Sequence, residues 1–193
     1  MIKLNIAPTK EPISLYEAKL HLRTDYDDPV EDNLIDALIT TSRQYAEQFQ
    51  HRGYITQTWE LWFDEWPDGD YIEIPIVPLQ SVDSITYFDT DGTEATLSSD
   101  DYFVDTKSEP GRVHLNYGET WPSTALRPAN GVCVTFVAGY GDDASDVPES
   151  MRQAMLLLIG HLYENREVVM TTGASAVKVP FTLEALLWQQ KVF

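Results

Sequence analysis

Residues 54–66, YITQTWELWFDEW, mark the point where the chain changes from a helical to an extended periodicity. Apolar and polar residues alternate here: Trp59 and Leu61 fall on one side of the expected strand, and Thr58 and Glu60 on the other. A period of two is typical of a strand that buries one face. The turn-forming residues that follow predict that this strand is the first half of a hairpin, with Trp59 as a core anchor.

The segment before this stretch predicts two helices. Ser14, with Glu17 three residues later, has the spacing of a capping box and starts a short helix. Residues 30–53 form the clearest helical pattern, in which Leu34 and Leu38 share a face. The glycine that ends this range is the expected stop signal.

The segment after this stretch predicts a block of short strands. Pro75 and Pro78 restrict their strand to an edge or a bend, because proline cannot donate a ladder hydrogen bond. Asp91 and Gly92 are the expected tip of a second hairpin. Residues 132–141, VCVTFVAGYG, are almost continuously apolar, which favours a central strand.

The C-terminal part returns to helical spacing. Residues 148–167 predict a long helix with Met155 and Leu158 on one face and Ile159 and Tyr163 on another. A helix that is apolar on several faces is buried on several sides, and we expect one of those sides to contact another copy of the chain. A short amphipathic helix is expected at the C-terminal end.

The order of these elements predicts an α+β fold. We expect a small helical bundle built from the N-terminal and C-terminal helices, with an antiparallel β-rich domain inserted between them. The expected boundaries assign residues 1–53 and 140–193 to the helical, ring-forming domain and residues 54–139 to the β-rich domain.

Composition excludes several classes of protein. The net charge is −18, with only 13 Lys and Arg residues, so the clustered positive charge of an ordinary nucleic-acid-binding surface is missing. No apolar run is long enough to cross a membrane, and the N-terminal residues lack a signal-peptide pattern. The single cysteine, Cys133, lies in an apolar strand and is interpreted as core rather than as a nucleophile. We expect a soluble protein made in the cytoplasm.

The tryptophans and carboxylates of residues 55–75 raise the question of a glycan-cleaving site. Asp64 and Glu65 are the only two carboxylates of this stretch that are adjacent in sequence, and adjacent residues on a strand point to opposite faces. The two carboxylates of a glycosidase must flank one bond across roughly 5–10 Å. We therefore interpret this pair as part of a solvated turn.

Three further patterns fall short of a ligand site. A calcium loop starting at Asp89 would place Gly92 at its fourth position instead of the sixth. The glycines of residues 139–141 lack the lysine of a phosphate-binding loop. His161 and Glu164 lack a second histidine one turn away. The sequence thus predicts no catalytic, metal or cofactor site and favours a binding or assembly protein over an enzyme.

The order of several segments resembles the head–tail connector (adaptor) family of tailed phages, in its longer members with a β-rich insertion. Each motif is weak alone, but their order along nearly the whole chain is specific. The segments are EPISLYEAKLHLR (11–23), DNLIDALITTSRQYAEQFQHRGYITQTWEL (32–61), IPIVPLQSVDSITYFDTDG (74–92), YFVDTKSEPGRVHL (102–115), VTFVAGYG (134–141) and VPESMRQAMLLLIGHLYENRE (147–167).

The resemblance implies a structural role without chemistry or cofactor. Adaptors of this family form a ring of about twelve copies under the portal, bridge it to the next neck or tail-completion protein, and let DNA pass without binding it specifically. It further implies a location in the virion neck, assembly in the host cytoplasm, and no membrane partner. The negative charge suits a channel through which DNA slides.

Candidate contact residues follow from the helices that are apolar on more than one face. The candidate subunit or portal interface comprises Leu156, Ile159, Tyr163, Phe181, Leu186, Leu187, Trp188 and Phe193. The candidate core anchors are Trp59, Leu34, Leu38, Met155 and Leu158.

Two alternatives remain open from the sequence. An acidic DNA mimic that inhibits a nucleic-acid-binding enzyme would use the same net charge. A glycan-binding module would use the tryptophan-rich hairpin, with Trp62 and Trp66 exposed to the sugar.

Overall fold

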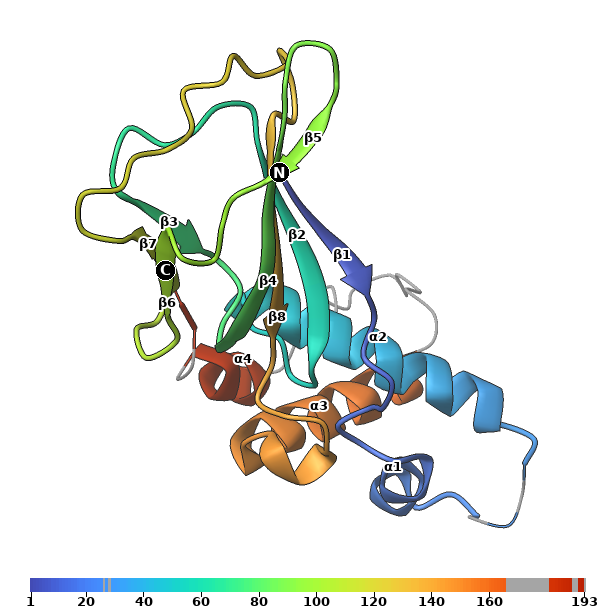
Figure 1. Ribbon diagram of the computed structural model, residues 1–193. Coiled ribbons are helices and arrows are strands. Elements are labelled where there is room, and N and C mark those ends of the chain that lie inside the picture. Colours follow the sequence, from blue (N-terminus) through green and yellow to red (C-terminus); the bar gives the residue numbers. More distant parts are fainter. Residues whose placement is uncertain (26, 28, 166–180, 189–190, 193) are drawn as a thin grey trace, which may run out of the picture. The chain divides into compact units, whose positions relative to one another are not determined.

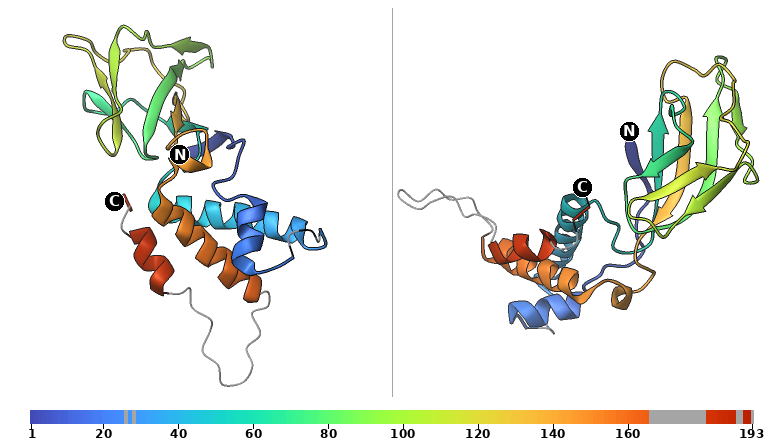
Figure 2. Two further views of the ribbon diagram at one scale, coloured as in Figure 1. Left: turned by 90° about the horizontal axis from the view of Figure 1, so that it is seen from below. Right: turned by 90° about the vertical axis from the view of Figure 1, so that its left-hand side faces the viewer.

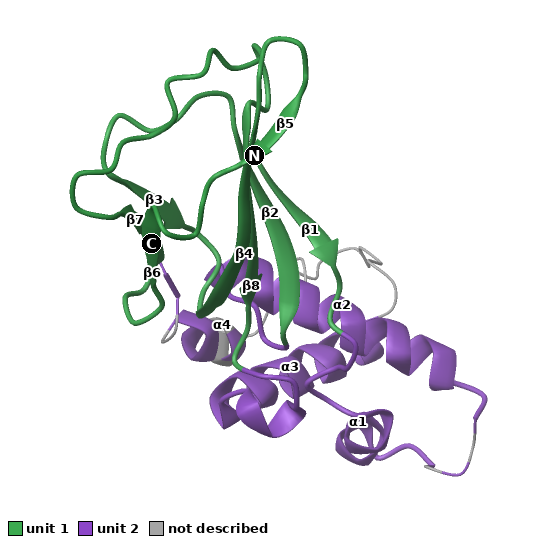
Figure 3. Ribbon diagram, viewed as in Figure 1, with its two compact units in different colours: residues 1–8, 56–140 green, residues 9–55, 141–193 purple. Residues whose placement is uncertain are grey.

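The computed structural model describes residues 1–25, 27, 29–165, 181–188 and 191–192. The chain forms two compact units, which Figure 3 distinguishes by colour. The β unit comprises residues 1–8 and 56–140, and the helical unit comprises residues 9–55 and 141–193. Antiparallel sheets and helices occur together, which confirms the predicted α+β class.

The larger sheet of the β unit has five antiparallel strands (Figure 1). Its central strand is the apolar run predicted for that place, since it pairs with a neighbour on each side. In spatial order the strands are β1 (Ile2–Ile6), β2 (Gln57–Phe63), β8 (Val132–Ala138), β4 (Leu79–Phe88) and β5 (Glu94–Thr96).

The smaller sheet has three strands, in the order β3 (Tyr71–Ile74), β7 (Gly111–Leu115) and β6 (Tyr102–Asp105). β3 lies at an edge, as the prolines that follow it predict. The core of the β unit contains apolar residues from both sheets. Its buried members are Leu61, Ile72, Ile74, Leu79, Ile85, Leu97, Val113, Val132, Val134, Phe136 and Ala138.

The predicted hairpin after β2 is wrong. β2 pairs with β1 and β8, whereas the next strand, β3, pairs with β7 in the other sheet. The turn residues between them carry the chain from one sheet to the other. Asp64 fixes the start of this crossing because its carboxylate accepts a hydrogen bond of 2.8 Å from the Asn130 N–H.

The first strand of the larger sheet was not predicted from the sequence. β1 pairs with β2 through residues such as Leu4, which lies opposite Trp59. Residues 1–8 therefore belong to the β unit, whereas residues 1–53 were predicted to belong to the helical domain. All five residues of β1 are exposed. Although apolar residues alternate along it, β1 is therefore an edge strand and not a core strand.

The helical unit contains four helices and one short 3-10 turn (Ala144–Asp146) in its described part. Ser14 and Glu17 form the predicted capping box at the start of the first helix. The second helix ends at Gln50, before the predicted stop, because His51 already adopts the left-handed conformation that ends a helix. The helices are α1 (Leu15–Leu22), α2 (Asp32–Gln50), α3 (Glu149–Glu164) and α4 (Phe181–Trp188).

The core of the helical unit is apolar, but ion pairs hold its periphery. Ile35, Ile39, Met155 and Ile159 are almost fully buried. Arg43, only 5% exposed, contacts Glu11 at 2.7 Å and Glu47 at 2.8 Å. The pair with Glu11 joins the segment before α1 to α2. Lys19, also buried, pairs with Asp32 and joins α1 to the start of α2.

No helix in the described part of the chain is long and apolar enough to cross a membrane.

Candidate interaction surfaces

An aromatic cluster lies on the surface of the helical unit where α2 meets α4. We define it as Tyr45, Phe49 and Trp188. Tyr45 stacks on Phe49 with ring centroids 6.4 Å apart, and Phe49 meets Trp188 edge to face at 5.9 Å. Trp188 is 51% exposed and Tyr45 38%. The ammonium of Lys191 lies 4.4 Å from the Phe49 centroid and 4.9 Å from that of Trp188, which adds a cation to this surface.

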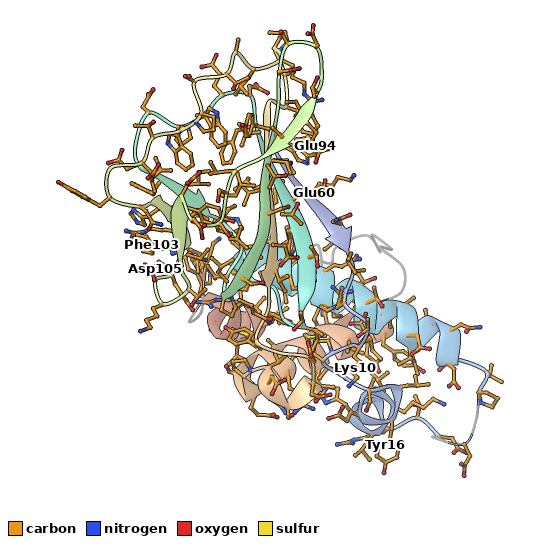
Figure 4. All side chains as sticks on the ribbon, in the orientation of Figure 1. Lys10, Tyr16, Glu60, Glu94, Phe103 and Asp105 are labelled. Atoms are coloured by element: carbon orange, nitrogen blue, oxygen red, sulfur yellow. The ribbon has the colours of Figure 1, made fainter. Side chains whose placement is uncertain are left out.

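A groove lies between α1 and α3 on the same unit. Leu20 and Leu156 supply its apolar lining, and Leu20 is 67% exposed. Gly160 of α3 faces the His21 ring of α1, and a Cβ built there would be in ordinary contact with that ring at 3.4 Å. Tyr16, 61% exposed and labelled on α1 in Figure 4, extends the apolar surface by one helical turn from Leu20. The α1–α3 groove is lined by Glu17, Leu20, His21, Glu149, Arg152, Gln153 and Leu156.

Arg152 fixes the polar rim of the α1–α3 groove. Its guanidinium donates to the Pro12 carbonyl at 3.1 Å, to Glu149 at 2.9 Å and to Glu17. Burial raises the pKa of the Glu17 carboxyl, but hydrogen bonds from Ser14 and the charge of Arg152 outweigh burial, so the pKa lies below its usual value. The rim is therefore negatively charged at neutral pH, and the Glu149 side chain is 67% exposed.

The smaller sheet of the β unit presents an aromatic row. His114 of β7 lies between two rings: it is tilted against Tyr71 of β3 at 5.1 Å and stacked on Phe103 of β6 at 5.3 Å. The three residues are cross-strand neighbours. Two residues along the chain, on the same face of the sheet, β3 carries Glu73, β7 carries Arg112 and β6 carries Asp105. The Phe103 and His114 rings therefore cover part of each other's faces. Phe103 is still 51% exposed.

The tryptophans of the opening stretch do not present open faces for a sugar. Trp62 stacks on Phe88 at 6.1 Å, and the Arg127 guanidinium lies 3.9 Å from the Phe88 centroid. Trp66 stacks on Trp121 at 4.9 Å. Both Trp62 and Trp66 are partly buried, which differs from the exposure that the sequence suggested. Sugar-binding platforms need ring faces open to solvent, so the geometry does not favour a glycan site here.

Cys133 lies in the core of the β unit, and the His161 backbone makes a hydrogen bond near the end of α3. Cys133 is 3% exposed, and burial raises the pKa of its thiol to about 11. A thiol of this kind is inert at neutral pH. The His161 carbonyl accepts a hydrogen bond of 2.7 Å from the side chain of Asn165. Among the described residues, no group of three or more His, Cys, Asp or Glu side chains could hold a metal ion.

The predicted contact residues divide according to burial. Trp188 is exposed, whereas Ile159 and Leu187 lie in the core of the helical unit. The remaining described members, Leu156, Tyr163 and Leu186, are partly buried, while Phe193 and the Phe181 side chain lie outside the described residues. Of the predicted core anchors, Met155 and Leu158 are buried, and Trp59, Leu34 and Leu38 are partly buried.

Sequence reasoning missed the α1 surface. Tyr16 and Leu20 lie one helical turn apart and face solvent, away from buried Ala18. The signal was present, because two large apolar residues at a spacing of four form a stripe of their own.

Comparison with known proteins gives matches of structure but not of sequence family. No family model matches the chain, and no curated protein matches it. One similar structure is the neck of an empty gene transfer agent (GTA) particle, which was computed with C6 symmetry. A chain of that neck matches with a TM-score of 0.83 and 23% sequence identity, and the match covers 100% of this chain and 96% of that one.

Two further structures agree. A chain in the virion of a native GTA particle has a TM-score of 0.80, and a chain in the neck of a native GTA particle, computed with C12 symmetry, has a TM-score of 0.73. Each is 22% identical, and each match covers 100% of this chain and 96% of that one. At this level of identity the likeness shows that the chain has the same fold, from end to end.

Proposed function

We propose that this chain is a structural connector in the neck of a phage-like particle. Copies of it form a ring under the portal, bridge the portal to the next neck or tail component, and leave a passage for DNA. The observation that carries this proposal is the fold match over 100% of the chain to chains in particle necks. A match of both units together supports a shared role more strongly than a match of one common domain.

Ring formation is supported by the symmetry of the similar structures and by the surfaces of the chain. The two necks were computed with C6 and C12 symmetry, and a ring of twelve copies satisfies both. The helical unit exposes Tyr16, Leu20 and Trp188, which are large apolar side chains of the kind that subunit contacts bury.

The proposed role requires no catalysis and no specific binding of DNA. The net charge of −18 repels a phosphate backbone, so DNA can move past the protein without being held. This charge also fits an acidic DNA mimic, but such an inhibitor gives no reason for a fold shared along its whole length with particle-neck chains.

The test is self-association and portal binding of the purified full chain. Light scattering after size exclusion, over a concentration series, reports the mass, and negative-stain images report the shape. The expected result is a closed ring with a central channel, in solution or on addition of the portal protein of the same particle. A chain that neither associates with itself nor binds the portal at any concentration would overturn the proposal.

A further inference from the structure

The two apolar surfaces of the helical unit involve different helices around α3. Figure 1 and both views of Figure 2 place α3 between α1 and α4. The aromatic cluster (Tyr45, Phe49 and Trp188) includes α4, and the α1–α3 groove includes α1. A head-to-tail contact between identical subunits requires two different surfaces, and the cluster and the groove share no residue.

We propose that the aromatic cluster of one copy packs into the α1–α3 groove of the next copy. The inference rests on the proposed function, because it assumes a ring, but it adds which surfaces form the subunit contact. Trp188 is the central residue of the contact on one side, and Leu20 and Leu156 form the receiving surface on the other.

The chemistry of the two surfaces is complementary. Trp188 is 51% exposed and Leu20 is 67% exposed, so their contact would remove a large apolar area from water. Tryptophan is among the residues that contribute most to binding when buried at the centre of an interface. The cluster therefore provides an anchor, and the groove provides two apolar side chains, Leu20 and Leu156, among polar and charged neighbours.

The charges of the two surfaces are complementary as well. The cluster carries the Lys191 ammonium over its rings. The groove carries Glu17 and Glu149 with Arg152 paired to both, which leaves an excess of one negative charge, and the Glu149 side chain is 67% exposed at the rim. Opposite charges at the edge of an apolar contact fix its register and disfavour the reverse pairing of cluster with cluster. A second copy of this chain is therefore the occupant that the surfaces fit.

Cross-linking tests the contact in the full-length protein. Two single variants, Trp188→Cys and Leu20→Cys, are mixed at a concentration raised enough to offset the weaker association expected without Trp188, and are treated with a short bismaleimide. Cys133 stays in both variants, because it is 3% exposed and serves as the unreactive background. The matched control replaces Trp188→Cys by Asp36→Cys, an exposed position on α2 outside both surfaces.

The expected product is a cross-linked dimer that contains one copy of each variant, formed well above the level of the Asp36→Cys control and absent when either variant is treated alone. Equal yields from the control mixture, or cross-linking of Trp188→Cys with itself, would overturn the inference. If rings form without the mixed product, the proposed function stands and only the assigned contact is wrong. If the chain neither associates nor binds the portal, both are wrong.

Substitutions give an independent measure. Trp188→Ala should weaken self-association about 30-fold, the loss typical of a truncated anchor residue at an interface. Lys191→Glu should also weaken self-association. Adding Glu149→Lys to the same chain should restore part of the loss, because each contact in the ring then again joins a negative residue 191 to a positive residue 149. Far-UV circular dichroism checks that each variant is folded. Unchanged association of folded Trp188→Ala would contradict the inference.

Discussion

At the scale of single residues, the buried Arg43 shows how charge holds the helical unit together. Burial lowers the pKa of its guanidinium, but the hydrogen bond to Glu11 and the charge of Glu47 outweigh burial and raise it. Glu47 also accepts a hydrogen bond of 2.8 Å from the Tyr54 N–H. Removing the arginine alone would leave a carboxylate buried without its cation, which is more damaging than removing the whole network.

Arg43→Ala should therefore lower the free energy of unfolding by about 3–5 kcal/mol. Urea denaturation followed by circular dichroism measures this loss. The control is Lys10→Ala, which removes an ion pair of 2.5 Å with Asp143 in which both side chains are largely exposed. Because solvent screens that pair, its removal should leave stability almost unchanged. Equal losses of unfolding free energy in the two variants would show that the buried ion pairs of Arg43 contribute no more to stability than the exposed pair of Lys10.

Cys133 predicts a pH dependence of stability. Its thiol has a pKa of about 11 in the folded chain and near 9 when unfolded, so the unfolded state ionises first. The contribution of this thiol to the free energy of unfolding is fully present below pH 9. It is lost as the pH rises from 9 to 11, and the loss is at most about 2–3 kcal/mol.

The measurement that isolates this effect compares wild type with Cys133→Ala. Lysines and tyrosines also titrate above pH 9, but they do so equally in both proteins. The free energy of unfolding should fall more steeply with pH in wild type than in the variant. Parallel profiles for the two proteins would show that the thiol ionises in the folded chain as readily as in the unfolded one.

At the scale of elements, the close approach of β7 to β4 depends on Gly111. A Cβ at this position would lie 2.6 Å from Leu79 Cδ2 and 2.7 Å from Leu79 Cβ. Gly111→Ala should therefore destabilise the protein by about 1–3 kcal/mol through overpacking. Thermal or urea unfolding measures the loss. Gly69→Ala is the control, since a Cβ there meets nothing within 4 Å.

A double-mutant cycle with Leu79→Gly identifies the cause. Leu79→Gly alone removes a core side chain that is 4% exposed, but it also removes the Cβ, Cγ and Cδ2 atoms that a Cβ on Gly111 would meet. Gly111→Ala should then cost much less in the Leu79→Gly background than in wild type. An unchanged cost would place the strain in the backbone of β7 rather than in its contact with Leu79.

The elements themselves were largely predictable, because periodicity is a local signal. The capping box of α1, the central place of β8 and the Asp91–Gly92 hairpin between β4 and β5 were all confirmed. Strand pairing depends on residues far apart in the sequence, and this is why the prediction of a hairpin after β2 was wrong. Turn residues show that the chain changes direction, but they do not show whether the next strand joins the same sheet.

β1 was missed for a related reason. Residues such as Leu4 are apolar at every second position, which is a strand pattern, but five residues give a weak signal on their own. β1 pairs with β2 across more than fifty residues of sequence, which no local pattern reveals. The helical surfaces were predictable in part: Trp188 was assigned to a contact, but Ile159 and Leu187 lie in the core. Apolar residues on several helix faces indicate burial without showing which partner buries each face.

At the scale of the whole molecule, net charge and apolar contact oppose each other in assembly. Each copy carries a net charge of −18, so neighbouring copies repel one another. The subunit contact inferred above gains its stability from Trp188 and Leu20, which salt does not weaken. Its one cross-subunit ion pair is small beside the repulsion between two such strongly charged chains.

Self-association should therefore strengthen as the salt concentration rises. The Debye length falls from about 10 Å at 0.1 M to about 3 Å at 1 M, which screens the repulsion between copies but leaves the apolar contact intact. Analytical ultracentrifugation at a series of sodium chloride concentrations measures the association constant, and Trp188→Ala serves as the control that lacks the apolar anchor. An association that weakens with salt would mean that ion pairs, rather than the aromatic cluster, provide most of the subunit contact, because only attraction between charges is lost on screening.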